Sequence, residues 1–292
     1  MRLNPFNPGS INVRRGGGGG GFPSGGGGQV GCGALVIAII GAVVFGIDPG
    51  QMLGGMQGMQ QGSDSGTFQG APAGGESAGE ICDDNAYAVE SCNALGSLDE
   101  TWQPAFQQAG IAFQQPTLVF YQGGTNSGCG GATAAAGPFY CPADQGIYID
   151  TSFYDQMAQQ FGAGGDFARY YVIAHEYGHH VQHLTGVADA IRSAQNQSPQ
   201  QANQLQVLME LQADCYAGVW AGRNRAAIEP GDFEEGMTAA SAIGDDALMR
   251  GAGQAVNPES FTHGSSEQRM QALRLGLETG DDTQCDRIVE RG

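Results

Sequence analysis

The segment His175-Glu-Tyr-Gly-His179 constrains this chain more than any other stretch, because its side chains converge only if the segment is a helix. In a helix, residues four apart share one face, so both imidazoles can bind the same metal ion. The pattern is typical of zinc hydrolases, in which the glutamate after the first histidine acts as a general base. We therefore predict one zinc ion (Zn2+) bound by His175 and His179, with Glu176 as the base. A metal-free histidine pair inside a buried helix is the alternative.

A catalytic zinc ion usually takes three protein ligands and leaves one position for water, so another ligand is needed. On the same helix, His180 points away from the pair and His183 lies one turn further along. Glu210 and Asp214 are four residues apart in a second predicted helix, beside small residues that allow close packing. We predict that Glu210 is the third ligand. We predict that Asp214 accepts a hydrogen bond from the far nitrogen of a zinc-bound histidine. An exposed acidic stripe is the alternative.

Charge and composition exclude nucleic acid as a partner. The 292 residues include 30 acidic side chains and 12 basic ones, all of them arginine, for a formal net charge of -18. Binding to a phosphate backbone requires clustered positive charge, which this chain lacks. The 50 glycines are concentrated toward the N-terminus, so we expect one folded domain with a well-solvated acidic surface.

Residues 30–47 contain no charged or strongly polar side chain and are just long enough to cross a bilayer as a helix. Arginines precede this run and acidic residues follow it, so the positive-inside rule predicts a cytosolic N-terminus and a translocated C-terminal part. We predict an uncleaved single-pass anchor in the lipid bilayer, with the folded domain in the periplasm or outside the cell. A cleavable signal peptide and a buried core helix are the alternatives.

Composition divides the chain into four parts. The glycine-rich stretches on both sides of the apolar run are expected to be flexible, because they contain little that a core could bury. The predicted parts are a cytosolic Gly-rich segment (1–29), the transmembrane anchor (30–47), a flexible Gly/Gln/Met-rich linker (48–80) and the folded domain (81–292).

Seven cysteines are consistent with an oxidising compartment once Cys32, in the apolar run, is set aside. The other six allow fifteen pairings, and none has the CxxC spacing of a zinc or redox site. Short loops favour two local pairs, which leaves a third pair by elimination. The expected disulfides are Cys82–Cys92, Cys129–Cys141 and Cys215–Cys285. Buried free thiols in a cytosolic protein are the alternative.

Strand patterns come first in the predicted domain, and helix patterns follow. Runs of β-branched and aromatic residues predict strands, whereas caps and apolar periodicity predict helices. The predicted strands are 116–121 and 146–150, and the predicted helices are 166–184, 198–226 with Ser198 as the cap, one from Asp232 and one from Ser265. In the last two helices, Glu235 and Gln268 stand where a capping box needs them. A few strands followed by helices indicate an α+β fold, mostly helical with a small sheet.

Several motifs of this domain resemble those of a known family. The motifs are Ser127-Gly-Cys-Gly130, Gly137-Pro-Phe-Tyr-Cys-Pro142, Ile147-Tyr-Ile-Asp150, His175-Glu-Tyr-Gly-His-His-Val-Gln182 and Glu210-Leu-Gln-Ala-Asp214. From about residue 80 to 290, the chain resembles the bacterial neutral zinc metallopeptidases, the YpfJ-like proteins. Its helix pair is also similar to the zinc site of the HtpX-like peptidases. The resemblance implies a zincin-like fold and peptide or protein substrates.

The resemblance also implies roles for residues outside the helix pair. The stretch from Thr262 to Arg269 is similar to a segment of the HtpX-like enzymes, which assigns His263 and Arg269 to oxyanion or substrate contact. An ordinary helix start with a solvated arginine is the alternative. By architectural analogy, strand 146–150 is expected to be the sheet edge that pairs with an extended substrate.

The leading hypothesis is a membrane-anchored zinc endopeptidase that acts outside the cytosol. Water on the zinc ion would lose its proton to Glu176 and attack the peptide carbonyl. The main alternative is a zinc-containing envelope scaffold with little or no hydrolytic activity, and hydrolysis of another kind of bond is a third hypothesis. The presence of Glu176 beside the predicted ligands favours the enzyme, because a structural zinc site needs no base.

Overall fold

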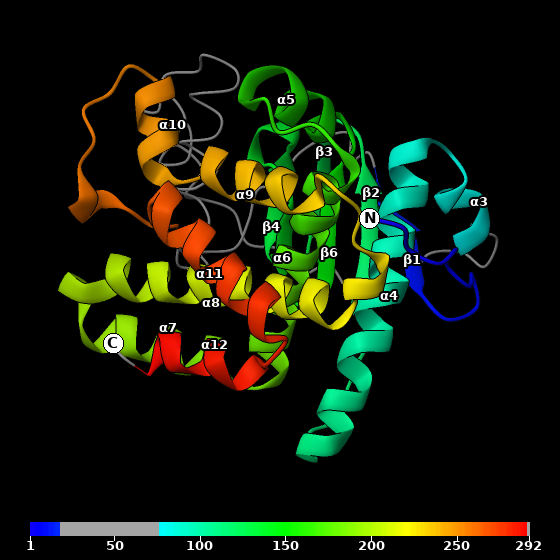
Figure 1. The fold of residues 1–292 in the computed structure, drawn as a ribbon, viewed down its shortest axis with the longest axis horizontal. Helices are drawn as coiled ribbons and strands as arrows, with labels where there is room; N and C mark the ends of the chain where they lie inside the picture. The colour runs from blue at the N-terminus through cyan, green and yellow to red at the C-terminus, as the bar shows by residue number, and fades with distance from the viewer. Residues whose placement is uncertain (18–75, 291–292) are drawn as a thin grey trace, which may run out of the picture.

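The computed structural model describes residues 1–17 and 76–290 (Figure 1). A small mixed sheet stands beside a larger body of helices, and the N-terminal segment joins the sheet. The predicted α+β class, mostly helical with a small sheet, is confirmed. The predicted anchor at 30–47 and most of the predicted linker lie outside the described residues.

The main sheet has four strands in the order β1, β2, β6, β5, and a separate hairpin contains β3 and β4. Strands β1, β2 and β6 run parallel, whereas β5 pairs antiparallel with β6. The strands are β1 (Asn12–Arg15), β2 (Thr117–Tyr121), β3 (Gly124–Ser127), β4 (Gly130–Thr133), β5 (Phe139–Cys141) and β6 (Gly146–Asp150).

Both predicted strands are present, but β6 does not occupy the predicted place. It lies between β2 and β5, and all five of its residues are buried. The expectation that 146–150 forms a sheet edge is therefore wrong. A strand whose residues are buried on both faces belongs in the interior of a sheet, where helices or other layers cover it. Among the described strands, β5 forms the edge on this side.

The N-terminal residues also belong to the folded domain. Strand β1 pairs with β2 from Asn12 opposite Thr117 to Arg15 opposite Phe120. This pairing corrects the predicted domain start at residue 81, because 1–17 form one folded unit with the chain from residue 76 onward. The sequence did not predict β1, since four residues are too short for a clear alternating pattern.

Helices make up most of the rest of the described chain. They are α3 (Ala78–Cys82), α4 (Ala86–Ala109), α5 (Ser152–Phe161), α6 (Asp166–Leu184), α7 (Val187–Gln197), α8 (Ala202–Arg223), α9 (Asp232–Ala242), α10 (Asp245–Gly251), α11 (Ser266–Thr279) and α12 (Asp282–Val289). Helix α6 has the predicted bounds, whereas α4 has no predicted counterpart. Pro104 lies inside α4, and proline is normally a signal against a helix interior.

The predicted helix starts are confirmed in part. Helix α11 begins after Ser265, and both hydrogen bonds of the capping box with Gln268 are present. Helix α8 begins later than predicted, after a short 3-10 turn, and Ser198 makes no side-chain capping bond. Helix α9 begins at Asp232 as predicted, but Glu235 accepts a hydrogen bond from the Phe167 amide instead of closing a capping box.

Helix α8 packs closely against two neighbours because small residues face it. A Cβ atom on Gly178 of α6 would lie 2.9 Å from the Ala213 Cα atom of α8. On the other side, a Cβ atom on Gly276 of α11 would lie 2.0 Å from the Cys215 carbonyl oxygen. The predicted close approach of α8 to the histidine helix is therefore present at Ala213, whereas Gly218 faces α11 instead, near Leu273.

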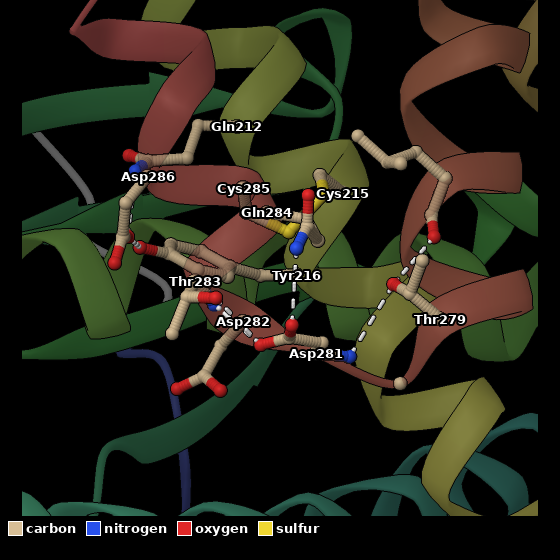
Figure 2. Close-up of a disulfide and its surroundings, with 12 residues drawn as sticks. Gln212, Cys215, Tyr216, Thr279, Asp281, Asp282, Thr283, Gln284, Cys285 and Asp286 are labelled. Carbon is tan, nitrogen blue, oxygen red and sulfur yellow. Dashed lines mark hydrogen bonds between the residues drawn. A yellow bond between two sulfur atoms is a disulfide. The ribbon is translucent and has the colours of Figure 1, made fainter.

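Three disulfides join the expected cysteines. The sulfur pairs are Cys82–Cys92, Cys129–Cys141 and Cys215–Cys285. Figure 2 shows the third, which ties α8 to α12, with the Asp286 carboxylate nearby accepting a hydrogen bond from the Tyr216 hydroxyl at 2.7 Å. The C-terminal helix is thus bonded covalently to the helix that contains the predicted zinc-binding glutamate.

None of the helices within 1–17 and 76–290 combines the length and the apolar character that a bilayer crossing requires.

Tyr177, inside the histidine motif, anchors α6 to α4. Its hydroxyl donates a hydrogen bond of 2.7 Å to Oδ1 of Asp99, and Gln115 donates a second to Oδ2 at 2.9 Å. Asp99 is only 5% exposed. Burial raises the pKa of Asp99 to about 7, although both hydrogen bonds oppose that shift. The folded protein therefore favours the neutral form of this carboxyl group below about pH 7.

We expect the Asp99→Asn variant to change how stability depends on pH. Because the pKa of Asp99 rises from 3.8 to about 7 on folding, its stabilising contribution is complete below the lower value and is lost progressively as pH rises from there to about 7. The loss is on the order of 4 kcal/mol for a shift of this size. Urea unfolding at about pH 5 and about pH 8 should show a smaller difference in the variant than in the wild type. Glu278→Gln, at an exposed position of α11, is the control and should not alter the slope.

Candidate metal centre

The predicted ligands converge in the structure. One ligand atom from each of His175, His179 and Glu210 lies within 4.8 Å of the others, and all come from α6 and α8. The Glu210 Oε2 atom is 3.2 Å from His175 Nε2 and 3.4 Å from His179 Nε2. The far Glu210 oxygen accepts a hydrogen bond of 2.8 Å from Gln206, which fixes the carboxylate. The geometry thus brings two imidazole nitrogens and one carboxylate oxygen to one point.

The far nitrogen of each histidine also has a partner. His175 Nδ1 lies 2.7 Å from Asp214 Oδ1, as predicted. His179 Nδ1 lies 2.8 Å from Gln182 Oε1, a contact that the sequence analysis missed. Because each acceptor takes the Nδ1 proton, each Nε2 atom is left with a free lone pair for a metal ion.

Gln182 is itself held rigidly. It is fully buried, and its amide nitrogen donates to the Met209 carbonyl oxygen at 2.7 Å and to the Gln212 side chain at 2.9 Å. Those two donations leave the amide oxygen to face His179. The position three residues after His179 was the only sequence signal for this contact, since residues three apart are neighbours on a helix.

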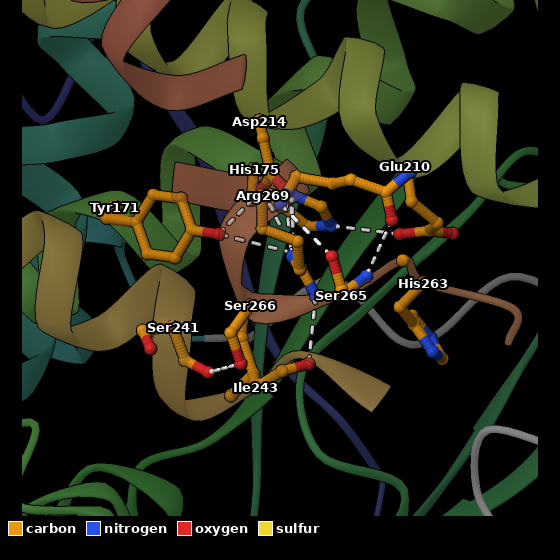
Figure 3. A network of polar contacts seen from close by, with 12 residues as sticks. Tyr171, His175, Glu210, Asp214, Ser241, Ile243, His263, Ser265, Ser266 and Arg269 are labelled. Atoms are coloured by element: carbon orange, nitrogen blue, oxygen red, sulfur yellow. Dashed lines mark hydrogen bonds and ion pairs between the residues drawn. The ribbon is translucent and has the colours of Figure 1, made fainter. Parts of the chain in front are cut away.

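Arg269 does not reach the place predicted for it. Figure 3 shows its guanidinium beside Asp214, where both contacts measure 2.9 Å, and its side chain is 2% exposed. The Tyr171 hydroxyl donates to the same carboxylate at 2.6 Å. The expectation of substrate or oxyanion contact is corrected, because a buried guanidinium that is paired with Asp214 has no free face for a substrate. Arg269 supports the histidine ligand through Asp214.

The electrostatics of this cluster attract positive charge. Burial raises the pKa of Asp214, but the charges of Arg269 and His175 outweigh burial and lower it to about 2. Burial lowers the pKa of His175 and His179, but the Asp214 and Glu210 carboxylates outweigh it and raise both. The two carboxylates therefore stabilise either extra protons or a metal cation at the histidine lone pairs.

Glu176 is 8% exposed and lies in α6 directly after the first ligand. Burial raises its pKa, while positive charge on the two histidines opposes the shift. A buried carboxylate whose pKa is raised toward neutrality can both accept and return a proton, which suits general acid–base chemistry.

His263 lies on the Glu210 side of the network (Figure 3). Its Nδ1 atom is 3.1 Å from Asp245 Oδ1, and the other oxygen of Asp245 accepts backbone hydrogen bonds from Thr262, His263 and Gly264. The Asp245 carboxylate thus orients the ring through Nδ1 and leaves Nε2 for another partner. Asp245 was not identified from the sequence, because 18 residues separate it from His263.

The other two histidines do not join the cluster. His180 is fully buried between the Tyr140 hydroxyl at 3.0 Å and the Gln114 carbonyl oxygen at 2.7 Å, and burial lowers its pKa to about 4. The ring of His183 faces Tyr140 at a centroid distance of 6.2 Å. Neither belongs to the group of ligand atoms that His175, His179 and Glu210 form.

A second group of acids, Asp166, Asp232 and Glu235, could also bring three oxygens within 4.8 Å. The Met1 amine lies 3.0 Å from Asp166 and 2.9 Å from Asp232, and Glu235 bonds the Phe167 amide. These contacts account for the acids as an ion-pair cluster.

The donor set of the first cluster fits zinc. Two imidazoles and one carboxylate, each held by a further hydrogen bond, match the ligand type and number of catalytic zinc sites with an open position. The cluster of His175, His179 and Glu210 therefore has the features of the metal centre of a zinc hydrolase.

Comparison with known proteins identifies the family. A family model described as "Putative neutral zinc metallopeptidase" matches residues 7–288, and the chain belongs to this family. Uncharacterized protein YpfJ of Escherichia coli (strain K12) is 49% identical over 195 residues, which cover 66% of this chain and 68% of that protein. Uncharacterized protein Rv2575 of Mycobacterium tuberculosis is 40% identical over 203 residues, which cover 65% and 67%. No solved structure gives a significant match to the chain.

We expect Arg269→Met to destabilise the protein strongly. The substitution leaves the Asp214 carboxylate buried without its cation, which typically costs about 3–5 kcal/mol. Arg274→Met, at an exposed position of the same helix, is the matched control and should cost less than about 1 kcal/mol. Urea unfolding measures both. Equal losses in the two variants would contradict the assigned role of Arg269.

We expect Gln182→Met to weaken zinc binding about 10- to 100-fold, because His179 loses the acceptor that orients its ring. Gln182→Glu retains an oxygen at that place and should bind zinc more tightly than the methionine variant. Competition with a chromophoric chelator measures the affinity, and circular dichroism confirms that each variant is folded. Unchanged affinity in the methionine variant would show that Gln182 does not position the ligand.

Proposed function

We propose that this protein is a zinc-dependent metallopeptidase that hydrolyses peptide bonds. The observation that carries the proposal is the convergence of His175, His179 and Glu210, with the buried Glu176 next to the first of them. Membership of the neutral zinc metallopeptidase family supports the same reaction class. The buried base favours an enzyme over a scaffold, since a site that only holds zinc gains nothing from a buried carboxylate beside it.

Each side chain of the metal centre has a role in the proposed reaction. The zinc ion, when bound, would polarise the substrate carbonyl and acidify a water molecule. Glu176 accepts the proton of the attacking water and returns it to the leaving amine. His263 in its doubly protonated form donates from Nδ1 to Asp245 and from Nε2 to the oxyanion that forms on the substrate. Asp214 and Gln182 hold the two histidine ligands in the required tautomer.

We further propose a zincin-like arrangement in which an extended peptide pairs with β5. This strand is the antiparallel edge of the sheet, and its Tyr140 hydroxyl contacts His180 of the ligand helix at 3.0 Å. Backbone pairing with an edge strand binds peptides with little dependence on their side chains. Peptide or protein substrates of varied sequence are therefore expected.

The disulfides support a compartment outside the cytosol. Structural disulfides form and persist mainly in oxidising environments, so the three pairs favour a domain that works in the periplasm or beyond the cell. Contact of residues 30–47 with a lipid bilayer stays a prediction, because those residues lie outside the described chain.

The decisive experiment compares the full-length wild type with Glu176→Gln in casein hydrolysis, with and without a chelator. Loss of the base should lower the rate about 10²- to 10⁴-fold while zinc content is retained. Glu267→Gln, on the exposed face of α11, is the control and should keep wild-type activity. If the wild type and Glu176→Gln both bind one zinc ion and are equally inert, the scaffold hypothesis replaces the enzyme.

A further inference from the structure

Residues 1–17, which we call the N-terminal strap, complete the main sheet of the domain. Strand β1 pairs with β2 over four residues, and the Gly16 amide continues the ladder by donating to the Phe120 carbonyl oxygen at 2.7 Å. The Gln115 side chain donates to the Ser10 carbonyl oxygen at 2.7 Å. The strap is therefore held by backbone hydrogen bonds that form only between directly adjacent segments.

Buried side chains fix the strap against α4. Ile11 is 6% exposed, and the Phe6 amide donates to the Asn93 side chain at 2.8 Å. A Cβ atom on Gly96 of α4 would lie 3.7 Å from Ile11 and 3.8 Å from Phe6, so this glycine lets the strap lie close to the helix. Such packing is that of a domain core.

The arginines of the strap have partners on the domain. Arg15 forms ion pairs with Glu76 at 2.6 Å and Asp84 at 3.0 Å. Arg14 donates to the Tyr148 hydroxyl at 2.7 Å, and Arg2 pairs with Glu229 at 2.7 Å. These three arginines were the basis for predicting a cytosolic N-terminus, but their contacts with the domain account for them without reference to a membrane.

The family match also includes the strap. The matching model begins at residue 7, ahead of the apolar run, and continues to residue 288. Residues 7–17 of the strap therefore lie within the same matched range as the metal centre.

We propose that the N-terminal strap and the 76–290 domain lie on the same side of any membrane that this protein touches. Hydrogen bonds of about 3 Å cannot join two segments across a hydrocarbon layer about 30 Å thick. A single crossing of the bilayer between residues 17 and 76 would place the strap and the domain on opposite sides, where these contacts could not form. The predicted single-pass topology put the N-terminus and the domain on opposite sides of the membrane. The present proposal puts both on the same side. It does not depend on the proposed peptidase activity.

Thiol labelling of the full-length chain in intact cells tests this proposal. Ser10→Cys in the strap and Asn196→Cys in α7 are each introduced, separately, into a Cys32→Ser background, and both positions are exposed. A membrane-impermeant maleimide is added before and after permeabilisation. We expect the same result for both cysteines: either both react before permeabilisation, or both react only after it. Reaction of one before permeabilisation and of the other only afterwards would overturn the proposal.

A cross-link between neighbouring strands tests the pairing itself. Asn12 and Thr117 are opposite each other in register, so cysteines at these positions are close enough for a disulfide. We expect mild oxidation of the Asn12→Cys/Thr117→Cys chain in intact cells to give a link within one chain. The control pair Asn12→Cys/Asn196→Cys should give none. Absence of the first link, with both thiols reactive toward maleimide, would show that the strap is not docked and would overturn the proposal.

Discussion

The contact between Gly178 and Ala213 is the constraint on which the metal centre depends. It brings α6 and α8 so close that a single Cβ atom on Gly178 would lie 2.9 Å from the neighbouring backbone. Glu210, about one turn before Ala213, then reaches both histidines of α6. A larger side chain at either position would move the helices apart and separate the ligand atoms, because packed helices cannot interpenetrate.

Charge burial adds a second requirement to this close packing. Asp214 is fully buried, so its carboxylate must be matched by cations and hydrogen-bond donors. Arg269 of α11 supplies the cation, Tyr171 supplies a donor, and His175 uses the same oxygen to set its tautomer. The ligand helix, its neighbour α8 and α11 are therefore joined by one network. The network favours this one arrangement of the three helices, because any other would leave a buried charge unpaired at a cost in free energy.

The metal ligands were predictable, but several of the groups around them were not. His175, His179 and Glu210 follow from spacing within helices, which is a local property of the sequence. Arg269 was assigned to the substrate because its position along the chain resembles that of a known enzyme class, whereas its burial depends on how α11 packs. Gln182 ends the histidine motif and Asp245 lies in none, but the role of neither is visible in the sequence, since an amide or carboxylate that orients a histidine is recognisable only once the two are in contact.

The sequence by itself determined the helix that carries the histidine pair, the cap of α11 and the expected cysteine pairing, because each depends on residues near one another or on few alternatives. Only the tertiary structure decided that β6 is an interior strand, that Arg269 serves Asp214, and that the N-terminal strap completes the sheet. These features join segments that are tens to hundreds of residues apart. The local periodicity of apolar residues does not predict such pairings, because the free energy that selects them comes from burial and charge compensation in the folded chain.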